Sequence, residues 1–370
     1  MRMLRGYLEL RGTILFRLPL LLLLVSVGRT RASSGDRSED FSGCLANCRA
    51  SGCAFLSAQA TKGAKGSTCI PDCIPPASGE AGEGGAESKL LTTAWELRAL
   101  RWTCNSECKY QCMVQREAAK TGAAPEKYYG KWPFKRVLGA QEPASLLLSL
   151  LNLLAHAYGL LSLRRTVARL PLVEGRAAYP YTGLWHLYAI FNINAWLWSA
   201  VFHARDCKVT EQLDYYSAVA LLGFSLIVAL IRALGLRTEA AQVTVSAPII
   251  GFTTTHIFAL MTFIDDYSWN MKVCLTMGAL QLGTWAIWGV RSRHPSLLKL
   301  LVAILGVAGA TALEVFDFPP YFGVFDAHSL WHAATVPLVL LWWSWVNDDA
   351  RYVAQKALKG KDVAEKGKTS

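Results

Sequence analysis

The chain has 370 residues, of which 52% are hydrophobic and 18% are charged. Soluble domains usually have about a quarter of their residues charged, so this composition favours a membrane protein. The net charge of +11 does not indicate a nucleic-acid partner, because the basic residues lie in short segments between long apolar runs. Such a pattern suits membrane topology better than a phosphate-binding face, and we exclude nucleic-acid binding.

Residues 1–32 have the pattern of a secretory signal peptide. Four arginines up to Arg17 precede a short apolar segment at 18–27, and the small residues Gly28 and Ala32 follow. Because this segment is too short for a comfortable transmembrane helix, we expect its removal, with an uncleaved signal anchor as the alternative.

Eight of the ten cysteines follow in a polar segment, 33–143, which we predict to be a luminal cysteine-rich domain. They are Cys44, Cys48, Cys53, Cys69, Cys73, Cys104, Cys108 and Cys112. An even number of cysteines after a secretion signal predicts disulfide bonds, but eight allow roughly a hundred pairings, so none is assigned. A zinc module is the alternative, although no histidine lies among these cysteines. We expect Cys207 and Cys274 to be free, and residues 77–88 to form a loop.

The fold class that follows is an all-α membrane protein, because the apolar runs reach membrane length from residue 144 onward. We predict seven transmembrane helices within 144–346, after the disulfide-rich luminal domain and before a basic cytosolic tail, 347–370. The seven spans are 144–163, 183–204, 213–235, 244–264, 270–290, 297–316 and 328–346.

The distribution of basic residues predicts the orientation of these spans. With the cysteine-rich domain in the lumen, the three luminal connections contain only Arg205, Lys208 and Lys272 as basic residues. The remaining arginines and lysines of this region fall in the cytosolic connections and the tail, as the positive-inside rule requires. An even number of spans would place the basic tail in the lumen, so seven spans are favoured over six.

Five polar residues inside the spans converge at the luminal side in this topology. Ser199 and His203 are four residues apart at the end of the second span, and His328 and His332 are four apart at the start of the seventh. Residues at this spacing share a helix face. Asp214 begins the third span at a similar depth, and intramembrane ionisable residues are usually functional because they are costly.

Three histidines with an open fourth position are typical of catalytic zinc sites, where zinc lowers the pKa of water to about 7. We assign His203, His328 and His332 as metal ligands, Asp214 as a proton acceptor or an orienting partner of a histidine, and Ser199 as a hydrogen-bond donor. A Ser/His/Asp triad is the alternative, but it leaves the second histidine pair without a role.

Other polar residues are placed around this site with less specific signals. Those that we expect to line it are Glu142, Asn192, Glu314 and Asp317. Four further histidines are predicted to be structural: His156, His186, His256 and His294.

The five-residue pattern resembles that of the CREST superfamily of seven-span metal-dependent hydrolases, which includes alkaline ceramidases and the progestin/adipoQ receptors. Within it, the chain is most similar to the PER-like family of lipid-remodelling factors that act after GPI attachment. The similarity extends from about Cys44 to Asp349, except for extra Gly-rich sequence between Cys53 and Glu96. The segments that carry it are 102–112, 130–134, 141–145, 194–206, 317–320 and 326–332.

This resemblance implies a phospholipase A2-type esterase that removes the sn-2 acyl chain from the phosphatidylinositol of GPI-anchored proteins. It implies GPI-anchored proteins and their lipid as partners, and a multi-pass location in the endoplasmic reticulum or Golgi membrane. Zinc as the cofactor is inferred from the three imidazoles and the open position, although other divalent ions bind imidazole too. Two alternatives stay open. One is a non-catalytic seven-span receptor or scaffold for GPI maturation, and the other is a ceramidase-like amidase.

Overall fold

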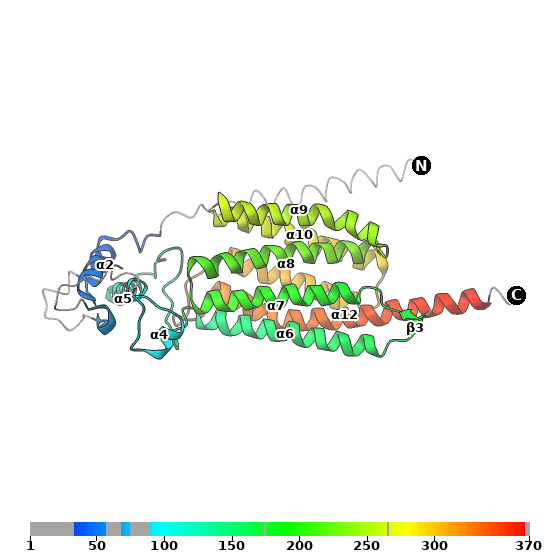
Figure 1. Cartoon of the computed structure of the whole chain (residues 1–370), viewed down its shortest axis with the longest axis horizontal. Coiled ribbons are helices and arrows are strands. Elements are labelled where there is room, and N and C mark those ends of the chain that lie inside the picture. Colours follow the sequence, from blue (N-terminus) through cyan, green and yellow to red (C-terminus); the bar gives the residue numbers. More distant parts are fainter. Residues whose placement is uncertain (1–32, 57–67, 75–88, 174, 265, 367–370) are drawn as a thin grey trace.

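The computed structural model describes residues 33–56, 68–74, 89–173, 175–264 and 266–366. The predicted signal peptide, 1–32, and the predicted loop at 77–88 lie outside the described residues. Seven long helices lie side by side in the described part, and a smaller helical region lies at one end of them (Figure 1).

The smaller region carries a core of its own, in which Phe41, Trp102 and Tyr128 are buried among the cysteines. Its two main helices begin at hydroxyl caps, because Ser38 and Thr103 accept hydrogen bonds from the backbone N–H groups of Phe41 and Ser106. The elements are α2 (Glu39–Ser51), β1 (Cys53–Ala54), β2 (Thr68–Cys69), the 3-10 helix η1 (Pro71–Cys73), α4 (Trp95–Ala99) and α5 (Cys104–Ala119).

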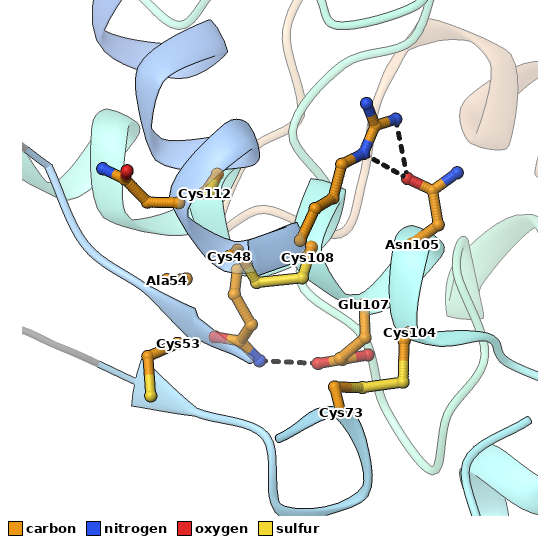
Figure 2. The surroundings of a disulfide bond; sticks show 12 residues. Cys48, Cys53, Ala54, Cys73, Cys104, Asn105, Glu107, Cys108 and Cys112 are labelled. Carbon is orange, nitrogen blue, oxygen red and sulfur yellow. Dashed lines mark hydrogen bonds between the residues drawn. A yellow bond between two sulfur atoms is a disulfide. The ribbon is translucent and has the colours of Figure 1, made fainter. Parts of the chain in front are cut away.

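Four disulfide bonds hold this region together, which confirms the predicted framework and assigns the pairing. Cys44 and Cys48 lie one turn apart on α2, and they pair with Cys112 and Cys108 of α5. The reversed order of the partners shows that the two helices run antiparallel. Cys53–Cys69 bridges the β1–β2 hairpin. Cys73–Cys104 ties η1 to the start of α5 (Figure 2). Cys207 and Cys274 are free, as predicted.

Each predicted span corresponds to one of the seven long helices, and the hairpin of β3 (Leu172–Val173) and β4 (Arg176–Ala177) joins the first two. The last helix continues well past residue 346, through most of the segment predicted as a tail, and extends beyond the others in Figure 1. The helices are α6 (Pro143–Ala168), α7 (Thr182–Ala204), α8 (Lys208–Leu234), α9 (Glu239–Thr262), α10 (Tyr267–Ser292), α11 (Leu297–Val315) and α12 (Ala327–Lys366).

Five of these helices are long and apolar enough to cross a membrane by length and composition: α6, α8, α9, α10 and α11. Within the described residues, α7 and α12 do not reach the same hydropathy. Histidine, asparagine and tryptophan side chains dilute their apolar sequence, and these two helices carry the three histidines predicted to bind a metal. The structure therefore supports a helical membrane protein, and the count of seven spans stays a prediction.

The packing order of the helices brings the predicted site residues together. Helix α6 packs against both α7 and α12, α7 packs against α8, and α12 also packs against α11. Buried tryptophans fill the core between them, among them Trp185, Trp285, Trp343 and Trp345. Thus α7, with Ser199 and His203, packs directly against α8, with Asp214. Helix α6 packs between α7 and α12, which carries His328 and His332.

Candidate metal centre

The start of α6, the end of α7 and the start of α12 meet at the end of the bundle that faces the cysteine-rich region (Figure 1). Two backbone hydrogen bonds hold the entry to α6 against the exit of α7. The N–H of Gln141 donates to the carbonyl of Ala204, and that of Glu142 donates to the carbonyl of His203, both at 3.0 Å. These bonds also satisfy carbonyls that the end of a helix leaves without a partner.

Three imidazole rings from α7 and α12 converge here through the same nitrogen atom. The Nε2 of His328 lies 3.3 Å from that of His203 and 2.9 Å from that of His332. His203 and His332 are buried, and His328 is partly buried. In a tetrahedral zinc site with Zn–N bonds of about 2.0–2.1 Å, ligand nitrogens lie roughly 3.3 Å apart. The cluster therefore has the donors and the spacing to hold a metal ion.

The opposite nitrogen of each ring has its own hydrogen-bond acceptor. Nδ1 of His203 lies 2.8 Å from Glu142, Nδ1 of His328 lies 2.5 Å from Glu314, and Nδ1 of His332 lies 3.2 Å from the Ser149 hydroxyl. Donation of the Nδ1 proton to these acceptors leaves the Nε2 lone pairs facing one another. Metal-binding histidines have this arrangement, since the partner fixes both the tautomer and the ring orientation.

Glu142 is held in its ionised form by Lys131 and by its hydrogen bond from His203. Lys131 lies 2.5 Å from its second oxygen and 3.0 Å from Asp206. Burial alone would raise the pKa of the Glu142 carboxyl, but Lys131 and His203 outweigh it and hold that pKa well below its ordinary range. Burial opposes the charge on Lys131 as well, yet Glu142 and Asp206 raise the pKa of its ammonium group. A charged Glu142 is the form that accepts the Nδ1 proton of His203.

Ser199 joins the centre through one intermediate residue. Ser149 donates its proton to the Ser145 carbonyl at 2.7 Å, and its oxygen lies 3.0 Å from the Ser199 hydroxyl. Because the Ser149 proton is used in this way, Ser149 accepts from both Ser199 and His332. Ser199 is thus linked to the histidines by two hydrogen bonds.

Asp214 lies on α8 within electrostatic reach of His328, Glu142 and Glu314. Among the described residues its carboxylate has no hydrogen-bond partner, in contrast to Glu142 and Glu314, which hold histidines. This carboxylate therefore has its oxygen atoms available to a molecule that enters the site.

The other predicted residues lie apart from the three rings. Asn192 is buried deeper on α7 and donates to the Tyr188 carbonyl. Asp317 accepts from the Trp132 indole at 2.8 Å and forms an ion pair with Lys127. It ties the segment before α6 to the loop before α12. The four histidines predicted to be structural, His156, His186, His256 and His294, have their hydrogen bonds and ring contacts outside the cluster.

Ser149 and Lys131 were not predicted as site residues. A signal for Ser149 exists in the sequence, since Ser145, Ser149, Asn152 and His156 recur at helical spacing along the otherwise apolar α6. All four are buried, so this polar stripe faces the bundle interior. The contact of Ser149 with His332 on α12 could not be inferred from spacing alone.

These features define a helical membrane protein with a three-histidine centre at the end of its bundle that faces a disulfide-bonded region. The model of the Per1-like family matches residues 94–350, and the chain belongs to this family. The resemblance seen in the sequence is thereby confirmed.

Curated relatives cover most of the chain. The "GPI-specific phospholipase A2-like PGAP3" of Mus musculus is 33% identical over 343 residues, which is 92% of this chain and 96% of that protein. The protein of the same name from Danio rerio is 37% identical over 259 residues, 68% of this chain and 78% of that protein. The "Post-GPI attachment to proteins factor 3" of Drosophila melanogaster is 32% identical over 331 residues, 88% and 92% of the two chains. No solved structure matches the chain.

Proposed function

We propose that this protein hydrolyses the sn-2 acyl ester of the phosphatidylinositol in GPI-anchored proteins. The observation that carries the proposal is the convergence of three Nε2 atoms whose Nδ1 atoms have acceptors in Glu142, Glu314 and Ser149. It occurs in a chain of the Per1-like family with relatives named as GPI-specific phospholipase A2-like proteins.

His203, His328 and His332 would hold the ion, and we propose zinc because it favours imidazole ligands in a tetrahedral set with one open position. A zinc ion so bound supplies Lewis-acid chemistry, which polarises an ester carbonyl and lowers the pKa of water. Glu142 and Glu314 keep His203 and His328 in the tautomer that presents Nε2.

The remaining residues handle the proton and the developing charge. Asp214 accepts a proton from the attacking water while the water oxygen bonds to the sn-2 carbonyl carbon. Asp214 then returns that proton to the departing glycerol oxygen. Ser199 donates its hydroxyl proton to the developing oxyanion in place of Ser149. The products are a free fatty acid and a lyso form of the anchor.

The proposed location is the endoplasmic reticulum or Golgi membrane, with the cysteine-rich region in the lumen and the C-terminal end in the cytosol. In this orientation the centre lies at the luminal ends of the helices, at the depth of an ester in the luminal leaflet. Substrate and site then meet without the anchor crossing the bilayer.

The test is to purify the wild type and a His328→Ala/His332→Ala variant in detergent. Bound metal is measured by mass spectrometry, and fatty-acid release is measured with a GPI substrate. We expect about one zinc ion per wild-type chain, and loss of both metal and activity in the variant. A His186→Ala variant is the matched control, because His186 lies on α7 outside the cluster and bonds to the Thr182 carbonyl.

A folded wild type that binds no metal and releases no fatty acid would contradict the proposal and favour a receptor or scaffold. Release of fatty acid from ceramide rather than from the GPI substrate would favour the amidase instead.

A further inference from the structure

A cavity of about 380 Å³ lies where the cysteine-rich region meets the end of the bundle. Its volume is within the range of about 300–1,000 Å³ that ligand pockets occupy. Helix α5 contributes one wall, the segment before α6 contributes a second, and Arg205 and Asp206, just after α7, contribute a third.

The lining is aromatic and cationic rather than aliphatic. Lys109, Lys131 and Arg205 supply three positive charges, and Asp206 supplies one negative charge. Six aromatic residues line the same cavity: Trp102, Tyr110, Tyr128, Tyr129, Trp132 and Phe134. Met113 is the one aliphatic apolar side chain among the described lining residues, so the apolar part of the lining consists mainly of aromatic rings.

This combination of groups matches a phosphorylated sugar. Aromatic faces pack against the apolar faces of sugar rings, and side-chain amides and hydroxyls, here from Asn105, Ser106 and Gln141, bond to sugar hydroxyls. Lysine and arginine form charge-assisted hydrogen bonds with phosphate. A peptide partner would not need the excess of positive charge.

The cavity also adjoins the three-histidine centre through Lys131. This lysine lines the cavity and bonds to Glu142, which in turn bonds to Nδ1 of His203. Arg205, on the same wall, follows His203 by two residues. It lies over the Trp102 ring at 3.8 Å and donates to the Ser106 hydroxyl at 3.1 Å. A headgroup in the cavity would therefore sit beside the centre at which its lipid must react.

We infer that this cavity binds the phosphorylated glycan headgroup of a GPI anchor and thereby selects the lipid whose acyl ester reaches the centre. The inference rests on the GPI substrate of the proposed function and assigns the part of the chain that recognises it. Phosphate lies at Lys109 and Arg205, beside Lys131, which is already paired with Glu142 and Asp206, and the sugar rings lie along the aromatic wall.

The experiment measures binding separately from hydrolysis. The full chain in detergent is titrated with the water-soluble phosphoinositol glycan of a GPI anchor, with the same glycan after phosphate removal, and with inorganic phosphate. We expect saturable binding of the intact glycan, and at least tenfold weaker binding of either of the other two ligands.

Two substitutions test the site, each with a matched control. Lys109→Gln removes a cation from the cavity, and Tyr129→Asn removes an aromatic ring. Asparagine tolerates the positive φ of 50° that Tyr129 adopts. We expect each to weaken glycan binding at least tenfold, whereas Lys89→Gln and Trp95→Ala, at exposed positions outside the cavity, leave it unchanged.

Equal affinity of the wild type and the cavity variants would overturn the inference, as would inorganic phosphate that binds as tightly as the glycan. Parallel assays of fatty-acid release separate this outcome from the proposed function. Hydrolysis without glycan binding would contradict the headgroup site only. Cavity-dependent glycan binding without hydrolysis would contradict the esterase activity and support the recognition site.

Discussion

At the scale of single residues, the three Nε2 atoms have no hydrogen-bond partner among the described residues except one another. Each Nδ1 atom lies beside an oxygen, and the three Nε2 atoms lie within 4.8 Å of one another. Lone pairs at that separation repel, and a cation between them removes the repulsion. The hydrogen-bond partners are therefore part of the site, since they decide which nitrogen would face a bound ion.

The first prediction concerns Glu142. Replacing it by glutamine removes the charge that orients His203, and we expect metal affinity to fall about 10- to 100-fold while the helices remain folded. Competition with a chelator of known affinity measures this loss. Asp206→Asn is the control, because Asp206 also pairs with Lys131 but does not contact a histidine in the described structure. If both variants lose metal affinity to the same extent, the loss of the ion pair with Lys131, rather than the orientation of His203, is responsible.

Spacing in the sequence predicted that the three histidines lie together, because two pairs at i and i+4 on helices of predicted direction should lie at similar depths. It was not sufficient for the hydrogen bond between Ser149 and His332, whose positions are 183 residues apart. Which faces of α6 and α12 meet depends on side-chain packing, and the helical period carries no information on that choice. The pairing of the eight cysteines was undetermined for the same reason.

At the scale of elements, the contact of α6 with α12 depends on a glycine. A Cβ atom at Gly159 would lie 2.1 Å from Cγ of Trp343, whose side chain is buried. An indole ring in a packed core cannot move aside without disturbing its neighbours. The close approach of the two helices fixes the height of α12 against α6, and with it the position of His332 beside Ser149.

The second prediction is that Gly159→Ala destabilises the protein by about 1–3 kcal/mol or more, as overpacking of a core does. Thermal unfolding in detergent measures the change. The control is Gly251→Ala on α9, where no other part of the described structure, apart from the backbone of α9 itself and the adjacent residues, lies within 4 Å of the added carbon. Because alanine is the better helix former, that variant should gain up to about 1 kcal/mol. A Gly159→Ala protein as stable as the control would contradict the close packing.

The composition of the elements also explains where sequence prediction was weaker. All seven helices follow from their apolar runs, but α7 and α12 are less apolar than the others because they carry the polar groups of the centre. The seventh predicted span ends at residue 346, and the helix that contains it continues to Lys366. Hydropathy indicates where a helix leaves an apolar medium. It does not indicate where the helix ends, because polar residues beyond that point can also form a helix.

At the scale of the whole molecule, the proposed orientation has a direct test in the chain itself. Ala119→Asn, an exposed change at the end of α5, creates the acceptor Asn-Lys-Thr with Lys120 and Thr121. Gly367→Asn creates the same tripeptide near the C-terminal end. We expect glycosylation of the first variant only, seen as a mass shift removed by an endoglycosidase, because acceptors are modified in the lumen. The second variant should carry a tag after Ser370 so that its acceptor is not terminal. Glycosylation of this second variant would contradict the proposed orientation.

The two ends of the bundle have different tasks, and the last prediction separates them. Asp349 is fully buried and accepts from Arg232 at 2.8 and 2.5 Å and from the Tyr179 hydroxyl at 2.9 Å. It follows His332 by 17 residues on α12, so this cluster lies about 25 Å from the histidines along the helix. The cluster joins α8 and the loop before α7 to α12, and it contains no residue of the centre.

Arg232→Met leaves Asp349 buried without its cationic partner, which should cost about 3–5 kcal/mol of stability. Because the histidines and their acceptors are unchanged, we expect the folded fraction to keep the metal content and metal affinity of the wild type. The double variant Arg232→Met/Asp349→Leu should recover most of the lost stability, since no unpaired charge remains. Unfolding in detergent and metal content of the folded fraction measure the two effects. Loss of metal from folded Arg232→Met protein would show instead that α12 couples the two ends, and that the centre depends on the whole length of the bundle.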